Sequence, residues 1–195
     1  MATPDSAWRM RIGRVVLLAA AAAMARPLPA SAQISGDVAG GYLNVSGTMH
    51  GGFGQVTFDL GPRWSVFGQV DGSRGHDLGD DTTTFRDVGV IGGARRRWQP
   101  SPRVSPFWQV GVGALHSEGI TDTVDIRGRP VHDTFTVNYL ALQSGGGVTV
   151  MMTPRVGMRA QLDLQFGIPD QSQFEGVSAF VRPSIGVVMR FGSRP

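Results

Sequence analysis

The chain contains no cysteine, so no disulfide bond holds its fold and no lipid-modified N-terminal cysteine can anchor it. Long apolar runs are missing too. The longest, Val15–Ala25, is about half of the ~20 residues that a helix needs to span a bilayer. Lysine is also absent, and every basic residue is an arginine. These absences exclude a disulfide-stapled fold and make Val15–Ala25 too short for a transmembrane helix.

The N-terminal segment instead has the pattern of a secretory signal peptide. Residues 9–14 contain three arginines, Val15–Ala25 is the apolar core, and residues 30–32 (Ala-Ser-Ala) form an A-x-A cleavage site. We therefore predict a signal peptide over residues 1–32, which directs export through the periplasm. Met10, as well as the first residue, is a possible translation start.

The excess of basic charge belongs to this segment. Residues 1–32 hold four of the 18 basic residues and one of the 15 acidic residues, so 14 of each sign remain. The sequence pI of about 10.5 is therefore no sign of a nucleic-acid partner, which would require a basic face. Residues 33–195 have the length of one domain, and we expect that domain to need no cofactor.

The clearest pattern in this domain is the alternation of apolar and polar residues over Val177–Phe191. Side chains on a strand point alternately to its two faces, so this stretch has one apolar and one polar face. It is longer than an ordinary strand of about 5–6 residues, and a tilted membrane-crossing strand needs about 9–11. Val156–Gly167 alternates in the same way. On these two strands, the residues expected to face lipid are Val156, Met158, Leu162, Leu164, Phe166, Val181, Ile185, Val187, Met189 and Phe191.

Eight such segments follow one another, and Pro-Arg opens three of them, at residues 62–63, 102–103 and 154–155. Proline presets a turn and cannot donate to a strand ladder, so it suits the start of a strand. The polar stretches 73–83 and 117–133 read as long loops, so short and long connections alternate, as in a meander that crosses a membrane. The segments are Asp37–Ser46, Phe53–Leu60, Trp64–Gly72, Thr84–Trp98, Val104–His116, Thr134–Met151, Val156–Gly167 and Val177–Phe191.

Trp64 and Trp98 fall where strands meet short turns, which is where membrane barrels carry interface aromatics. With the signal peptide, the eight segments and the terminal PSIGVVMRF, the chain resembles a bacterial outer-membrane β-barrel of the small eight-stranded, OmpA/OmpX-like class. The resemblance implies an all-β, eight-stranded antiparallel up-and-down transmembrane barrel, monomeric in the outer membrane. It also implies outer-membrane lipid and the barrel-assembly machinery as partners. In that class an aromatic residue commonly ends the chain, whereas residues 192–195 follow Phe191 here.

The polar faces of the segments carry charges that such a barrel would enclose. An eight-stranded barrel is just wide enough to be filled by side chains, and a buried charge needs a partner. We expect Asp163 to pair with Arg182. A plugged structural network is favoured over a narrow ion path. The candidate lumen charges are Asp59, Asp71, Asp87, Arg95, Arg97, Arg159, Asp163, Arg182 and Arg190.

Two stretches invite a chemical interpretation. His116-Ser117-Glu118 offers a base beside a nucleophile, but neighbouring strand residues face opposite sides and cannot meet, so we expect no enzyme. Residues 76–81 are rich in acidic side chains, yet their glycines do not match a calcium loop, so we expect no metal site.

These observations predict an outer-membrane barrel with a plugged lumen and a structural or interaction role through its surface loops. Residues 117–133 are the candidate site for an extracellular partner, either as an ordered loop, which is favoured, or as a hairpin with an open edge. A small passive porin-like channel is the alternative. A lipid-modifying enzyme and a soluble lipocalin-like binder are less favoured, because the apolar rows of the last two strands carry no charge.

Overall fold

A computed structural model describes residues 34–77, 80–99, 101–124, 130–170 and 176–192 of the chain. The chain separates into two units, Met1–Gln33 and Ile34–Pro195, and all described residues belong to the second. The predicted signal peptide thus lies outside the described residues and stays a prediction. Within the described ranges, no helix is long and apolar enough to cross a membrane.

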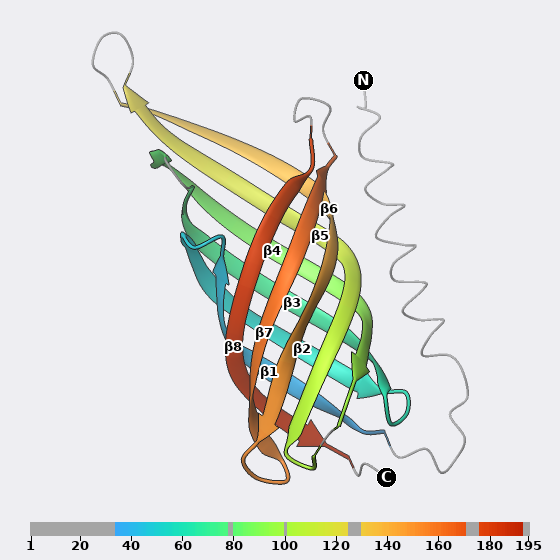
Figure 1. Ribbon diagram of the computed structural model, residues 1–195. Helices are drawn as coiled ribbons and strands as arrows, with labels where there is room; N and C mark the ends of the chain where they lie inside the picture. The colour runs from blue at the N-terminus through green and yellow to red at the C-terminus, as the bar shows by residue number, and fades with distance from the viewer. Residues whose placement is uncertain (1–33, 78–79, 100, 125–129, 171–175, 193–195) are drawn as a thin grey trace. The chain divides into compact units, whose positions relative to one another are not determined.

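The second unit is a closed barrel of eight antiparallel strands (Figure 1). Each strand pairs with the next along the chain, and β8 pairs with β1, where Gly36 lies opposite Phe191. The predicted eight-stranded antiparallel barrel is confirmed. Its strands are β1 Gly36–Val45, β2 Met49–Asp59, β3 Trp64–Asp77, β4 Asp80–Arg97, β5 Val104–Val124, β6 Pro130–Met151, β7 Val156–Pro169 and β8 Ser178–Phe191.

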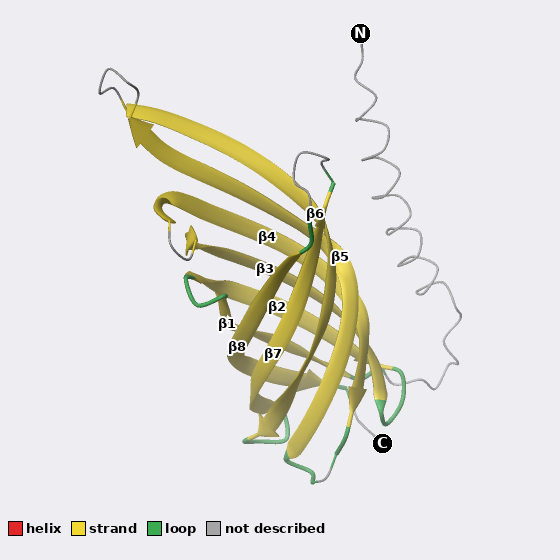
Figure 2. Cartoon of the chain, turned by 45° about the horizontal axis from the view of Figure 1, so that its top comes forward, coloured by secondary structure: helices red, strands yellow, loops and turns green. Residues whose placement is uncertain are grey.

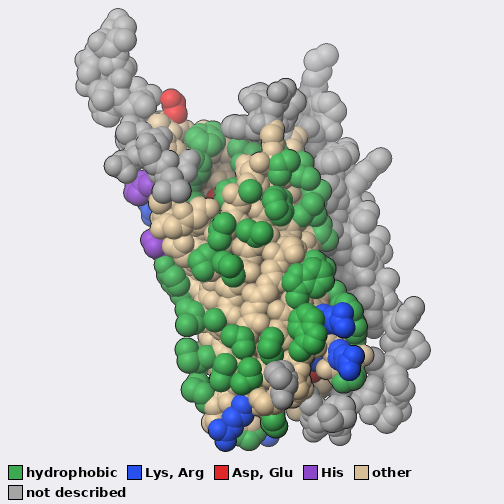
Figure 3. Space-filling view, viewed as in Figure 1, with side chains coloured by type: hydrophobic (Ala, Val, Ile, Leu, Met, Phe, Trp, Pro, Cys, Tyr) green, Lys and Arg blue, Asp and Glu red, His purple; other side chains and the backbone are tan. Residues whose placement is uncertain are grey.

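The alternation of the sequence decides which side chains enter the barrel. On β7 the polar residues Arg159, Gln161 and Asp163 are buried in the lumen, while Leu162 between them is 54% exposed on the outer wall. Figure 3 shows hydrophobic side chains spread over this wall. Of the ten residues expected to face lipid, eight are exposed, and Val156 and Phe191 are half-buried.

Residues that break the chemical pattern still obey the geometry of the strand. Phe67 and Ile91 stand in polar rows and are buried inside the barrel, whereas Arg96 stands in an apolar row and is exposed outside. The alternating row of β1 that contains Leu43 points inward as well. The interior therefore includes an apolar cluster, which consists of Ala39, Leu43, Val45, Met49, Phe53 and Val188.

The predicted long loops 73–83 and 117–133 are wrong, because most of their residues are strand. β3 continues to Asp77 and β4 begins at Asp80, while β5 and β6 run on to Val124 and from Pro130. The extensions of β3 and β4 are polar or small on both faces, and those of β5 and β6 carry only scattered apolar residues such as Ile120 and Val131, so they lack the alternation that marks a half-apolar strand. Their backbone ladder nevertheless continues, and Thr121 pairs with Asp133.

The two ends of the barrel therefore differ in the length of the strands. We call the end that carries Pro62, Pro102 and Pro154 the turn end, and the opposite end the hairpin end. β5 and β6 have 21 and 22 residues, against 10 in β1. Figures 1 and 2 both show the β5–β6 hairpin projecting beyond its neighbours at the hairpin end.

Candidate functional site

The centre of the lumen is occupied by Arg95 of β4, whose side chain has no solvent exposure. Its guanidinium donates to Gln109 Oε1 from Nε at 3.1 Å and to Thr57 Oγ1 from Nη1 at 3.3 Å, and Nη2 donates to Gln55 Oε1. The guanidinium carbon also lies 4.2 Å from the centroid of the Phe107 ring. Arg95 therefore bonds to β2 and β5 and lies against an aromatic face, which suits its planar cation.

A second guanidinium, that of Arg159 on β7, lies 5.2 Å from the same Phe107 ring. Arg159 Nη2 donates to Asp37 Oδ1 at 2.8 Å, and Nη1 donates at 2.7 Å to the Gln55 oxygen that Arg95 also uses. Nε donates to Thr149 Oγ1 at 3.1 Å. The sequence pattern does not single out Asp37 as a lumen charge, because its row in β1 continues with apolar residues.

Arg182 of β8 makes its ion pair across the lumen. The predicted pairing of Arg182 with Asp163 is wrong: the two are opposite each other in the β7–β8 register, but Arg182 bonds to Asp71 of β3 and to Gln165. Asp163 instead accepts hydrogen bonds from Gln109 Nε2 at 3.1 Å and from Gln161. A long arginine side chain reaches beyond its nearest neighbour, so strand register alone does not decide its partner.

Glutamines join these groups into one network. Gln55 Nε2 donates to Gln69 Oε1 at 3.0 Å, and Gln69 Nε2 donates to Asp71 Oδ2 at 3.1 Å. Four arginines and four aspartates of the described chain are buried as whole residues. They are Arg95, Arg97, Arg159, Arg182, Asp37, Asp71, Asp87 and Asp163.

Three predicted lumen charges, Asp59, Arg97 and Arg190, lie nearer the turn end. Arg97 Nη2 is 2.7 Å from Asp59 Oδ1, and both side chains are almost fully buried. Arg190 is half-buried on β8. Sequence reasoning missed the glutamines of the network, although their place in the polar rows marked them as inward-facing.

Glycines on neighbouring strands make room for the bulky interior side chains. A Cβ at Gly147 would lie 2.7 Å from the Phe107 ring, and a Cβ at Gly111 would lie 3.1 Å from the Phe67 ring. Near Arg182, the space between the lining side chains is too small for a water molecule. Side chains therefore fill the described interior both around the Phe67 and Phe107 rings and around Arg182.

The residues considered for catalysis are not brought together. His116 is exposed on the outer wall, hydrogen-bonded to Asn138 at 2.8 Å, whereas Ser117 is buried inside. They face opposite sides, as strand geometry predicts. Among the described residues, no three metal-ligating side chains gather. His76 is exposed, and the side chains of residues 77–82 lie outside the description.

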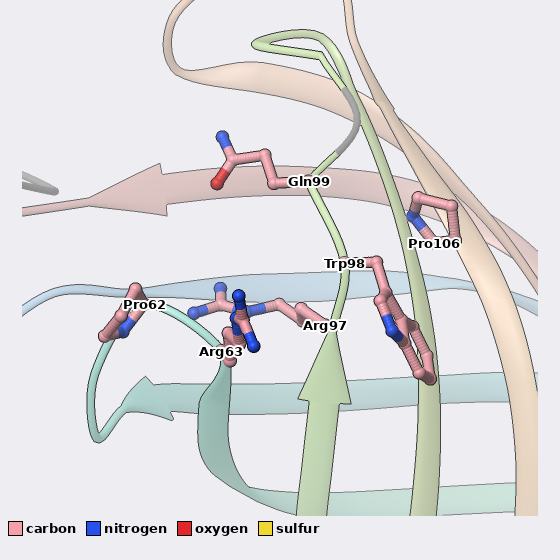
Figure 4. Close-up of a pocket in the computed structure, with 6 residues that line it drawn as sticks. All are labelled: Pro62, Arg63, Arg97, Trp98, Gln99 and Pro106. Carbon is pink, nitrogen blue, oxygen red and sulfur yellow. The ribbon is translucent and has the colours of Figure 1, made fainter.

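The turn end has a depression lined by six residues (Figure 4). Trp98 and Pro106 lie on one side of it, and Arg63 and Arg97 lie on the other. Trp64 and Trp98, the predicted interface aromatics, are 49% and 46% exposed. The lining residues are Pro62, Arg63, Arg97, Trp98, Gln99 and Pro106.

No protein-family model matches the chain, and no curated protein matches it. Solved structures do. One is the structure of Ail, the attachment invasion locus protein of Yersinia pestis, in complex with the heparin analogue sucrose octasulfate. Its sequence is 16% identical to this chain and the TM-score is 0.55; the match covers 82% of this chain and 100% of Ail. Neisserial surface protein A is 14% identical with a TM-score of 0.50, over 83% of this chain and 96% of its own. A major outer membrane protein from Thermus thermophilus is 15% identical with a TM-score of 0.50, over 83% of this chain and all of its own. At these identities the likeness is one of fold, and the chain has the fold of the small eight-stranded outer-membrane β-barrels.

Proposed function

We propose that the protein is a monomeric, integral barrel of the outer membrane, that its lumen does not conduct, and that it acts through its hairpin end. The observation that carries this proposal is the division of its side chains. Charges and amides, together with an apolar cluster, occupy the interior, and apolar side chains cover the wall. In this proposal the barrel has no catalytic role, because His116 and Ser117 stand on opposite faces of β5.

The wall supports insertion into a membrane. Along β4 the four outward positions between Arg86 and Arg96 are Val88, Val90, Gly92 and Ala94, without a charge. The outward arginines of β4 thus flank an uncharged band, where lipid headgroups would meet them, and this band of the wall can face acyl chains. The barrel-assembly machinery would insert it.

Membrane fractionation tests this part. The protein should stay in the outer-membrane fraction after an alkaline carbonate wash and should need detergent for extraction. Full solubility without detergent would instead favour the soluble, lipocalin-like alternative.

The filled lumen supports a barrel that does not conduct. Arg95 and Arg159 together bond to four other strands (β1, β2, β5 and β6), so ion passage would require this network to break. Planar-bilayer recordings of the purified protein should show no stable single-channel steps. Such steps would favour the passive channel.

The hairpin end supports an interaction role. The β6–β7 ladder begins only at Tyr139 opposite Pro169, so the β6 residues before it, such as Asp133 and Thr134, have no β7 residue opposite them. An extended strand edge of this kind can accept a strand from another chain. Ail, which shares the fold, has been solved with a heparin analogue, so a barrel of this fold can bind an external ligand.

Protease treatment of intact cells tests the exposure of this edge. Protease added outside should cut the chain within residues 122–132 and leave the barrel core intact. Protection of these residues in intact cells, combined with cleavage after lysis, would contradict an outward-facing hairpin.

A further inference from the structure

Arg96 is an exposed positive charge near the turn end of β4, next to the uncharged outward positions Val88, Val90, Gly92 and Ala94. Three of the chain's four tryptophans, Trp64, Trp98 and Trp108, surround it. In strand register, Arg96 lies opposite Trp64 on β3 and opposite Trp108 on β5, and Trp98 follows two residues later on the same face. Each tryptophan is between 44% and 49% exposed.

The contacts leave the hydrogen-bonding edge of Arg96 available. Its guanidinium carbon lies 5.8 Å from the Trp64 ring centroid and 5.4 Å from the Trp98 ring centroid, within the range of cation–π attraction. An aromatic ring offers no hydrogen-bond acceptor oxygen, so these contacts leave the N–H donors of the guanidinium without such an acceptor. No carboxylate among the described residues forms an ion pair with Arg96.

The surroundings of Arg96 add positive charge. Arg63 and Arg103, from the Pro-Arg turns on either side, are exposed at the same end of the barrel. The acidic residues nearest this end of the strands, Asp37 and Asp59, are turned inward and bonded to lumen arginines. The outer rim around Arg96 therefore carries positive charge, which favours an anionic ligand.

The neighbouring surface indicates an amphiphilic ligand. Toward the middle of the barrel, Arg96 is followed by the outward positions Val66, Ala94 and Val110, which form an apolar surface. Toward the turns lies the depression beside Trp98 and Arg63 (Figure 4). A free phosphate would use the cation alone, whereas a phospholipid would place its phosphate on Arg96 and its acyl chains on the apolar wall.

We infer that Arg96 and its three tryptophans form a binding site for the phosphate of an anionic glycerophospholipid in the membrane leaflet at the turn end. This inference rests on the proposed membrane insertion. The tryptophan rings hold the guanidinium at the level of the headgroups, and the indole N–H groups add donors there. The site should therefore prefer an anionic phospholipid to a zwitterionic one.

Tryptophan quenching by lipids brominated on their acyl chains measures this preference directly. The full chain carries Trp8→Phe in every variant, so that emission comes from the three wall tryptophans. It is reconstituted in phosphatidylcholine vesicles with increasing fractions of brominated phosphatidylglycerol or brominated phosphatidylcholine. We expect about fivefold stronger association of the phosphatidylglycerol, the ratio that corresponds to about 1 kcal/mol for one basic side chain near an anionic surface.

The matched variants are Arg96→Gln and Arg86→Gln, which remove outward-facing arginines from the same strand. Arg96→Gln should abolish the preference and keep the quenching by both lipids, whereas Arg86→Gln should change neither. Equal association of both lipids with the parent protein, or an unchanged preference in Arg96→Gln, would overturn the site. Loss of the preference in Arg86→Gln would overturn it too, because the effect would then be one of general charge.

Two further outcomes separate this inference from its premises. If millimolar glycerol phosphate in solution removed the preference, the ligand would be a soluble phosphate and not a membrane lipid. If neither brominated lipid quenched the tryptophans, membrane insertion itself would be overturned, and the lipid site with it. Strong but equal quenching would overturn the lipid site alone.

Discussion

Arg182 of β8 is bonded to Asp71 of β3, although neither strand is a neighbour of the other in the closed barrel. The pair therefore spans the lumen, and both side chains are almost fully buried. Through Gln69 and Gln55, the same network reaches Arg95 and Arg159. Each member depends on partners from other strands, so substitutions in the network test how much it contributes to the stability of the barrel.

Asp71→Ala should destabilise the barrel by about 3–5 kcal/mol, the cost of leaving one member of a buried ion pair without its partner. The measurement is the urea midpoint at which the folded band is lost on unheated gels. Asp170→Ala, at an exposed position beyond the end of β7, should stay within about 0.5 kcal/mol. The double variant Asp71→Leu, Arg182→Met should recover most of the loss, because it removes both charges together. An Asp71→Ala protein as stable as Asp170→Ala would show that the pair is not buried.

Leu162→Arg tests the outer wall. Leu162 is 54% exposed near the middle of β7, so a charge there would face acyl chains and cost about 2–4 kcal/mol. Leu60→Arg, in a turn where Leu60 is 69% exposed, should cost about 0–1 kcal/mol because headgroups and water reach it. Folding yield and urea stability in lipid vesicles give both values. Equal costs at the two positions would argue against lipid contact along β7.

Gly147→Ala tests the packing of the lumen. The added Cβ would lie 2.3 Å from the Ala160 carbonyl oxygen and 2.7 Å from the Phe107 ring, so either the backbone or the ring must move. Overpacking of this kind costs about 1–3 kcal/mol. Gly68→Ala is the control, because no atom lies within 4 Å of its added Cβ. Thermal loss of the folded gel band should separate the two variants, and a neutral Gly147→Ala would mean that the lumen is loosely filled.

Removal of the hairpin tip should leave the barrel folded and about as stable as before. Because Thr121 and Asp133 are paired, residues 122–132 can be replaced by Asn-Gly, which favours a two-residue hairpin turn. The free energy of unfolding should change by no more than about 0.5 kcal/mol, since the lumen network lies elsewhere. A partner recruited by the strand edge should bind this variant more weakly, because residues 130–132 of the edge are removed and residues 133–138 remain, as measured by co-purification from crosslinked cells. Failure of the shortened chain to fold would place the hairpin in the stable core of the barrel.

The alternation of residues was enough to predict the strands, the barrel and the side of the wall on which a residue such as Leu162 or Arg159 lies. Strand periodicity is local: once the backbone is extended, each side chain faces away from the next. Even Phe67, Ile91 and Arg96, whose chemistry contradicts their rows, follow this rule. Hydrophobic patterning therefore sufficed for the class of fold.

Strand ends and charge partners required the folded barrel. The extensions that end at Val124 and begin at Pro130 mix polar residues with scattered apolar ones such as Ile120 and Val131, so no periodicity reveals them, and cross-strand pairing makes them strands. The bond of Arg182 to Asp71 follows from closure of the barrel, which brings residues from opposite walls within reach. The grouping of Arg96 with Trp108 depends on the β4–β5 register. Register and closure join residues that are distant in the chain, and local patterns carry no record of such pairs.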